Sequence, residues 1–195
     1  MTIFEALNWG EQELRSTIKE KSIDGHNPKI DAQVLLAHTL GRTNSYLFAH
    51  FNDPIQDKHQ EKYHRFIERR MRHEPVAYIL GEKAFFGRQF RVNASVLIPR
   101  PETEIMIELA MPLINEQTTV IDIGTGSGAI AITLAKETDQ QVIAIDISTR
   151  ALAVAKYNAQ THKVDHKISF MEGNLLEPYI QKSINESGSH RSCVI

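Results

Sequence analysis

Three glycines at alternate positions, Gly124, Gly126 and Gly128, follow directly after a short apolar run that ends at Ile123. An apolar segment with helical periodicity begins at Ala129, so this stretch predicts a buried strand, a tight turn and a helix. A turn built from glycine lets a ligand approach the backbone closely, and the first N–H groups of the helix point toward that ligand.

A second apolar run at residues 142–145 ends in the carboxylate of Asp146. A carboxylate at the tip of the next strand, beside the glycine turn, is placed to accept hydrogen bonds from both hydroxyls of a ribose. The turn and this carboxylate together predict a cofactor that contains a nucleoside.

The elements that must hold these residues alternate from about residue 118 onward. Strands are predicted at 119–123, at 142–146 and from Ile168 to a turn at Gly173 and Asn174. Helices are predicted at 130–136 and after Ser148, whose hydroxyl can cap a helix. This alternation predicts the first half of a doubly wound α/β sheet.

Residues 1–80 have helical periodicity and predict a small helical bundle. Thr2 and Glu5 form a capping-box pattern, and Asn27 followed by Pro28 is typical of a helix start. The apolar side of this second helix is predicted to comprise Ile30, Val34, Ala37 and Leu40, and Gly41 ends it.

The segment between these two regions changes character. Residues 84–92 are rich in aromatic side chains, with Gly87 near the centre, and predict a hairpin. Pro101 can open the next helix, whose predicted buried side carries Ile105, Met106, Leu109 and Leu113.

The composition predicts a soluble cytoplasmic protein. The net charge is −2, which gives no overall field to attract nucleic acid or a membrane, and the single cysteine allows no internal disulfide. No apolar run approaches the ~18 residues of a membrane span. Arg65, Arg69, Arg70, Arg72 and His73 share one predicted helix. They are either a basic patch for an RNA-rich or acidic partner or, more commonly, a solvated helix face.

Four sequence blocks together resemble the PrmC/HemK family of release factor glutamine methyltransferases. They are FFGRQFRV, VLIPRPETE, DIGTGSGAIAI and IDIS followed by ALAVAKYNA, and they occur in the family's order. The glycine turn alone also fits the fingerprint of NAD enzymes, but Asp122 and the IPRPETE block favour enzymes that use S-adenosylmethionine.

The resemblance implies a fold and a set of site residues. Residues 1–80 would recognise a peptide chain release factor, 81–99 would form a hairpin linker, and 100–180 would be part of a Rossmann-like methyltransferase domain. S-adenosyl-L-methionine would lie against the turn, with its ribose on Asp146 and its adenine beside the third strand. The cofactor-binding residues implied are Gly124, Thr125, Gly126, Ser127, Gly128, Asp146, Asn174 and Leu175. Neither a membrane nor sequence-specific nucleic acid is an expected partner, and no histidine spacing predicts a metal site.

The sequence departs from the family at its catalytic motif, Asn-Pro-Pro-Tyr, which is absent: Asn185 is followed by Glu186. We therefore expect no catalytic residue in this chain, an irregular tail at 181–195, and a sheet whose central strand 119–123 lacks a partner on one edge. The hypothesis at this point is a truncated methyltransferase with little or no activity. The alternatives are a fragment that only binds release factor and, less favoured, an NAD-dependent oxidoreductase.

Overall fold

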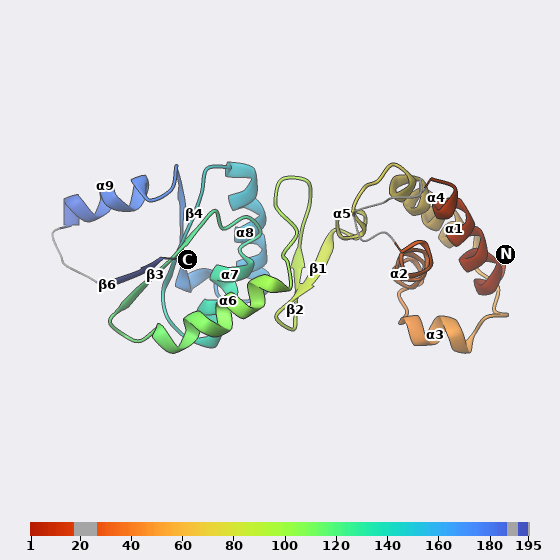
Figure 1. The fold of residues 1–195 in the computed structure, drawn as a ribbon, viewed down its shortest axis with the longest axis horizontal. Coiled ribbons are helices and arrows are strands. Elements are labelled where there is room, and N and C mark those ends of the chain that lie inside the picture. Colours follow the sequence, from red (N-terminus) through yellow and green to blue (C-terminus); the bar gives the residue numbers. More distant parts are fainter. Residues whose placement is uncertain (18–26, 187–190, 195) are drawn as a thin grey trace. The chain divides into compact units, whose positions relative to one another are not determined.

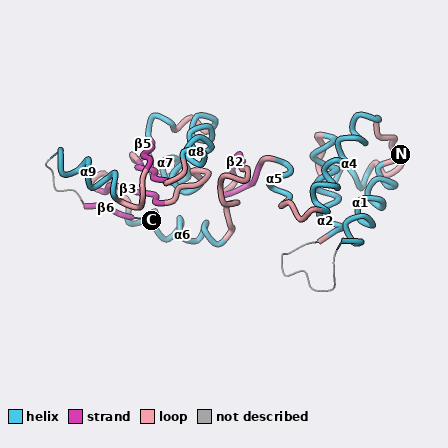
Figure 2. Tube along the Cα trace, turned by 90° about the horizontal axis from the view of Figure 1, so that it is seen from above, coloured by secondary structure: helices cyan, strands magenta, loops and turns pink. Residues whose placement is uncertain are grey.

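The computed structural model describes residues 1–17, 27–186 and 191–194, and the chain forms two compact units, residues 1–80 and 81–195 (Figure 1). Every named strand lies in the second unit, as the magenta segments of Figure 2 show. Among the described residues, no helix combines the length and the apolar character that crossing a membrane requires.

The first unit is a bundle of helices whose ends form where the sequence predicts them. The helices are α1 (Ile3–Thr17), α2 (Pro28–Leu40), α3 (Asn44–Ala49), α4 (Asp57–Met71) and α5 (Val76–Leu80). Thr2 and Glu5 exchange the two hydrogen bonds of a capping box, at 2.8 and 3.2 Å. The Asn27 side chain accepts from the Ile30 N–H at 3.1 Å, and Gly41 ends α2 in the left-handed conformation.

The predicted buried side of α2 is partly wrong. Ile30 is 52% exposed, whereas Leu35 and Leu36 are fully buried. Helix α2 carries apolar residues around most of its circumference, so packing against α1 and α4 decides its orientation and periodicity does not.

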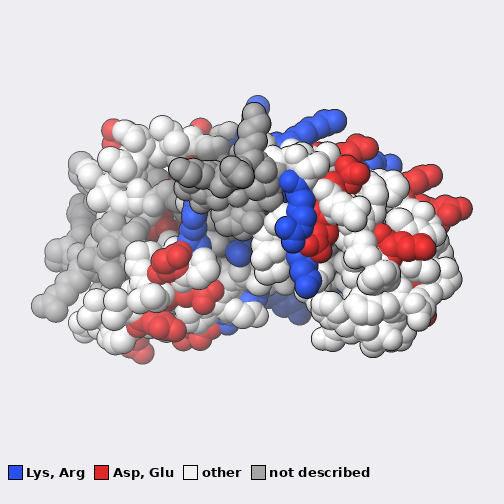
Figure 3. All heavy atoms as spheres, turned by 45° about the vertical axis from the view of Figure 1, so that its right-hand side comes forward, with Lys and Arg blue, Asp and Glu red and all other residues white. Residues whose placement is uncertain are grey.

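Two arginines of α4, Arg69 and Arg70, are held in ion pairs within the helical unit. Arg69 donates to both carboxylate oxygens of Glu74, at 2.7 and 2.5 Å. Arg70 is only 7% exposed and pairs with Asp31 at 2.8 Å. Figure 3 shows both basic and acidic side chains on the face in view. The internal pairing favours a structural role for these two arginines over a nucleic-acid surface.

The second unit begins with a hairpin of β1 (Glu82–Phe85) and β2 (Arg88–Arg91). Phe85 pairs with Arg88, so the loop consists of Phe86 and Gly87, whose φ angles are 47° and 69°. Two positive φ angles in a two-residue loop are typical of a type I′ turn, whose twist matches that of the strands. The Phe86 N–H also donates to Glu104 at 2.8 Å, which ties the turn to the next helix.

The remaining strands form a parallel sheet in the order β5-β4-β3-β6, and helices connect them. These elements are α6 (Glu102–Ala110), η1 (Met111–Leu113), β3 (Thr118–Ile123), α7 (Ala129–Glu137), β4 (Val142–Asp146), α8 (Thr149–Thr161), η2 (Asp165–Lys167), β5 (Ile168–Glu172), α9 (Glu177–Glu186) and β6 (Arg191–Val194). A small helical bundle followed by the first half of a Rossmann-like sheet is the fold class that the sequence predicts, and it is confirmed.

The structure differs from the sequence prediction at the C-terminal end. Helix α9 extends to Glu186, and β6 pairs in parallel with β3 from Thr118 opposite Arg191 to Ile121 opposite Val194. The expectation of an irregular tail beside an unpaired β3 edge is therefore wrong for these residues. Strand formation here depends on the open edge of β3, which offers unpaired backbone groups.

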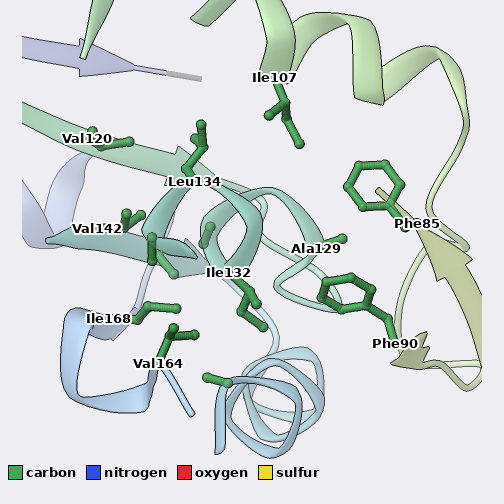
Figure 4. Close-up of a cluster of buried hydrophobic side chains, with 14 residues drawn as sticks. Phe85, Phe90, Ile107, Val120, Ala129, Ile132, Leu134, Val142, Val164 and Ile168 are labelled. Atoms are coloured by element: carbon green, nitrogen blue, oxygen red, sulfur yellow. The ribbon is translucent and has the colours of Figure 1, made fainter. Parts of the chain in front are cut away.

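The hairpin is part of the core of the second unit and not a separate linker. Phe85 and Phe90 are at most 1% exposed, and they belong to one apolar cluster with residues of β3, β4 and α7. Figure 4 shows Phe90 alongside Ala129 and Ile132 of α7. Burying two phenylalanines is worth about 1.5–3 kcal/mol each, which is enough to hold the hairpin against the α/β layers.

The predicted buried side of α6 is wrong. Ile105, Leu109 and Leu113 are 60–71% exposed and Met106 is 39% exposed, whereas Ile107 and Ala110 are buried. Residues 105–114 are apolar at nearly every position, so two different stripes of this helix could face the core. Contact with α7 and with the hairpin turn selects the stripe of Ile107.

Candidate functional site

The eight residues predicted to bind the cofactor lie at the carboxyl ends of three adjacent strands. The glycine turn, 124–128, follows β3, Asp146 ends β4, and Asn174 and Leu175 follow β5. The N–H groups of Gly124 and Thr125 donate to the Ile145 carbonyl at 2.8 and 3.0 Å, which holds the turn against β4. In open α/β sheets this edge is where ligands bind.

Asp146 has the geometry of a carboxylate that can take two hydroxyl groups. Its Oδ2 accepts from the Gly126 N–H and its Oδ1 from the Ser148 N–H, both at 2.9 Å. Each carboxylate oxygen has about two lone-pair sites, so each keeps one for a further donor. The two backbone bonds fix the side chain in place before any ligand arrives.

The residues of the turn differ in what they expose. Gly124 is exposed at a φ of +74°, and a Cβ placed there would meet no atom within 4 Å. Thr125 and Ser127 are buried, and a Cβ at Gly128 would lie 3.0–3.3 Å from Ile132 and Ala155. The backbone at Gly124 is thus open to a ligand, whereas Gly128 is required by the packing of α7 against α8.

Asp122, in β3, is hydrogen-bonded to the glycine turn and to the start of α7. It was not among the site residues predicted from the sequence. It is 1% exposed, and its Oδ2 accepts from the Thr125 hydroxyl at 2.7 Å and from the Ala131 N–H at 3.2 Å. The second bond satisfies one of the free N–H groups at the start of α7. An acidic residue in an otherwise apolar strand was the available sequence signal.

Burial raises the pKa of the Asp122 carboxyl from 3.8 to about 6. The hydrogen bonds from Thr125 and Ala131 act in the opposite direction, and the negative charge of Asp146 adds a smaller upward effect. The buried position of Asp122 therefore disfavours the ionised form of its carboxyl.

Two large apolar side chains are exposed beside this edge. Ile147, directly after Asp146, is 71% exposed, and Leu175 is 65% exposed at a φ of +49°. Ile147 follows β4 and Leu175 follows β5, and these two strands are neighbours in the sheet. The Gly173 N–H donates to the Asp146 carbonyl at 3.1 Å and so joins the ends of the two strands. Positive φ is uncommon for leucine and is often found at functional sites. The flat apolar ring of a nucleobase is a ligand that such side chains suit.

A metal centre has no support in the part of the chain that the structure describes, where no three His, Cys, Asp or Glu side chains gather in a way that could hold an ion. The candidate site comprises backbone groups of the glycine turn, the Asp146 carboxylate and the exposed side chains of Ile147 and Leu175.

Both units of the chain are similar to known protein families. Residues 5–81 match the model of the PrmC N-terminal domain, and residues 114–187 match a methyltransferase domain. A release factor glutamine methyltransferase of Bacillus subtilis strain 168 is 40% identical over 187 residues, which are 92% of this chain and 62% of that protein.

Two further relatives carry the same name. The protein of Bordetella pertussis is 40% identical over 73% of this chain and 54% of its own length, and that of Neisseria gonorrhoeae is 46% identical over 68% and 49%. The chain thus spans between about half and three fifths of these curated relatives. The resemblance to release factor glutamine methyltransferases is confirmed.

Proposed function

We propose that this chain provides the cofactor-binding and partner-binding parts of a release factor glutamine methyltransferase. The reaction would transfer a methyl group from S-adenosylmethionine to the side-chain amide nitrogen of a glutamine in a peptide chain release factor. The observation that carries the proposal is that a PrmC N-terminal domain and a methyltransferase domain match in one chain. In the second of these, the eight predicted residues occupy one sheet edge.

The residues at that edge fit S-adenosylmethionine. Asp146 would accept hydrogen bonds from the two ribose hydroxyls with its remaining lone pairs. The methionyl part would lie along the open backbone of Gly124 and Gly126. The adenine would lie between Ile147 and Leu175, and Asn174 would accept from its amino group.

When bound, S-adenosylmethionine would supply a methyl group on a positively charged sulfur. The amide nitrogen would form the new bond to the methyl carbon and lose one proton to solvent, and the electron pair of the broken S–C bond would stay on sulfur. An amide nitrogen is a poor nucleophile and must be oriented for this reaction, and orientation can supply about 7–11 kcal/mol. In the family, Asn-Pro-Pro-Tyr provides that orientation, and these 195 residues do not contain it. We therefore propose that the chain as given binds the cofactor and transfers methyl groups slowly or not at all.

The helical unit is proposed to recognise the release factor. The match to the PrmC N-terminal domain covers almost the whole of this unit. Two arginines of α4 are held in internal ion pairs, so a nucleic-acid surface on that helix has less support. A release factor partner would place the protein in the cytoplasm, where translation ends.

Isothermal titration of the chain with S-adenosylhomocysteine and, separately, with NAD tests the cofactor assignment. We expect micromolar binding of S-adenosylhomocysteine and none of NAD. Tighter binding of NAD would show that the chain is a dinucleotide enzyme instead.

A pair of glycine variants locates the site. Gly124→Ala and Gly41→Ala both place a Cβ at a positive φ with no atom within 4 Å, but only Gly124 lies at the sheet edge. We expect Gly124→Ala to weaken S-adenosylhomocysteine at least tenfold and Gly41→Ala to leave its affinity unchanged. Equal affinities in the two variants would exclude this edge.

Binding of purified peptide chain release factor to the full chain, measured by biolayer interferometry, tests the partner. Methyl transfer is followed in the same samples with a radiolabelled methyl donor. We expect binding with little or no transfer. Absence of binding would contradict the proposed role of the helical unit, and rapid transfer would contradict the need for Asn-Pro-Pro-Tyr.

A further inference from the structure

Asn158, in the last turn of α8, is a buried amide whose polar atoms are all engaged. It is 1% exposed. Its Nδ2 donates to the Arg91 carbonyl at 3.0 Å and to the Ser127 carbonyl at 2.8 Å, and its Oδ1 accepts from the Arg91 N–H at 2.8 Å. One side chain therefore joins three segments that are 31 and 67 residues apart in sequence.

The register of the hairpin explains why Arg91 needs this partner. The Val92 N–H donates to the Gly81 carbonyl, and Glu82 lies opposite Arg91. Hydrogen-bonded and non-hydrogen-bonded pairs alternate along an antiparallel ladder, so the N–H and C=O groups of Arg91 point away from β1. The carboxamide of Asn158 satisfies both, much as a neighbouring strand would, and it covers this part of the open hairpin edge.

On its other side, the same amide reaches the glycine turn. The Ser127 carbonyl lies between Gly126, whose N–H is bound to Asp146, and Gly128. A Cβ at Gly128 would be 3.1 Å from that of Ala155, which lies one turn before Asn158 on α8. Close packing therefore brings α8 to the turn, and Asn158 adds the directional bond that sets its position.

We infer that Asn158 is a positioning residue for the cofactor site: it fixes the glycine turn against the edge of the hairpin. The hairpin then acts as an outer support of the cofactor site through this amide. The inference deepens the proposed function and rests on it only for the identity of the cofactor.

Three variants test the inference. Asn158→Ala removes all three bonds, and Asn158→Asp keeps the acceptor but turns a carboxylate toward two carbonyl oxygens. Val164→Ala is the control. Val164 is 4% exposed and belongs to the apolar cluster of Phe85 and Phe90, so the substitution removes only apolar packing. Amide hydrogen exchange is measured without ligand at Gly124 and Thr125, whose N–H groups bind the Ile145 carbonyl and not Asn158.

We expect exchange at Gly124 and Thr125 to be at least tenfold faster in the two Asn158 variants than in Val164→Ala. We also expect S-adenosylhomocysteine to bind at least tenfold more weakly to them, with affinity in the control within twofold of the unaltered chain. Equal exchange rates, or equal affinities, in the Asn158 variants and the control would overturn the inference. Failure of the unaltered chain to bind S-adenosylhomocysteine would instead overturn the proposed function, and the exchange rates would still decide the role of Asn158.

If neither Asn158 variant folds, the unaltered chain provides the test. Binding of S-adenosylhomocysteine should then slow exchange of the Arg91 amide, which Asn158 binds, at least threefold more than that of Lys83 in the same hairpin. Equal slowing at the two amides would overturn the inference.

Discussion

Replacing Asp122 by Asn should change how the stability of this protein depends on pH. Burial raises the pKa of Asp122 from 3.8 to about 6 in the folded chain. Because the folded pKa lies above the unfolded one, the native state binds the proton more tightly. The stabilising contribution of the protonated carboxyl is fully present below pH 3.8 and is lost as the pH rises through 6.

The size of the effect follows from the two pKa values. At about 1.4 kcal/mol for each pH unit between them, the contribution is roughly 3 kcal/mol in total. Roughly 2 kcal/mol of this is lost between pH 4 and pH 7. In Asp122→Asn the amide oxygen can still accept from Thr125 and Ala131, but position 122 no longer titrates.

The assay is urea unfolding at a series of pH values, followed by far-UV circular dichroism. The free energy of unfolding of the unaltered chain minus that of Asp122→Asn should fall by about 2 kcal/mol from pH 4 to pH 7. Asp139→Asn is the control, because a hydrogen bond from Lys167 lowers the pKa of Asp139 and its pH dependence has the opposite sign. Carbon NMR of the Asp122 carboxyl should show a midpoint near 6. A difference that stays flat with pH, or a midpoint near 4, would refute the reasoning.

Three other substitutions have distinct expected outcomes. Asp146→Ala removes two charge-assisted bonds and the proposed ribose acceptor, so S-adenosylhomocysteine should bind about 100-fold more weakly in calorimetry, with no change in affinity refuting the ribose assignment. Gly128→Ala places a methyl group 3.0–3.3 Å from its neighbours at a φ of +78°, and it should lower the free energy of unfolding by about 1–3 kcal/mol, as read from thermal unfolding. Arg70→Ala leaves Asp31, which is 13% exposed, without its partner and should lower the free energy of unfolding by about 3–5 kcal/mol. Arg15→Ala removes one member of an exposed pair and should lower it by under about 1 kcal/mol. Fluorescence of the single tryptophan reports the unfolding of the helical unit in both arginine variants, and equal losses would contradict the comparison.

Local signals in the sequence determined the parts of this fold that could be predicted. The capping box at Thr2, the caps at Asn27 and Ser148 and the strand at 142–146 depend on residues within four positions of one another. Such short-range patterns act through hydrogen bonds or alternation that the chain makes with itself.

The errors occur where a partner distant in sequence decides between equal alternatives. Helix α6 is apolar on most sides, and only its contacts show that Ile107 is the buried residue and Leu109 is not. Residues 191–194 have no strong strand pattern, and β6 exists because the edge of β3 lies beside it. Neither the buried side of α6 nor the formation of β6 can be predicted from a stretch of about a dozen residues.

The glycine turn shows how far a motif specifies a site. The spacing of Gly124, Gly126 and Gly128 predicts a close-fitting turn but does not say where that turn lies. Besides the backbone bonds to the Ile145 carbonyl, three polar side chains from three elements hold it: Asp122 accepts from the Thr125 hydroxyl, Asp146 accepts from the Gly126 N–H, and Asn158 donates to the Ser127 carbonyl. Each of these bonds holds a different residue of the turn, so no single one can replace another. The precision of the cofactor cradle therefore depends as much on β3, β4 and α8 as on the glycines, and through Asn158 it depends on a hairpin that precedes the turn by more than 30 residues.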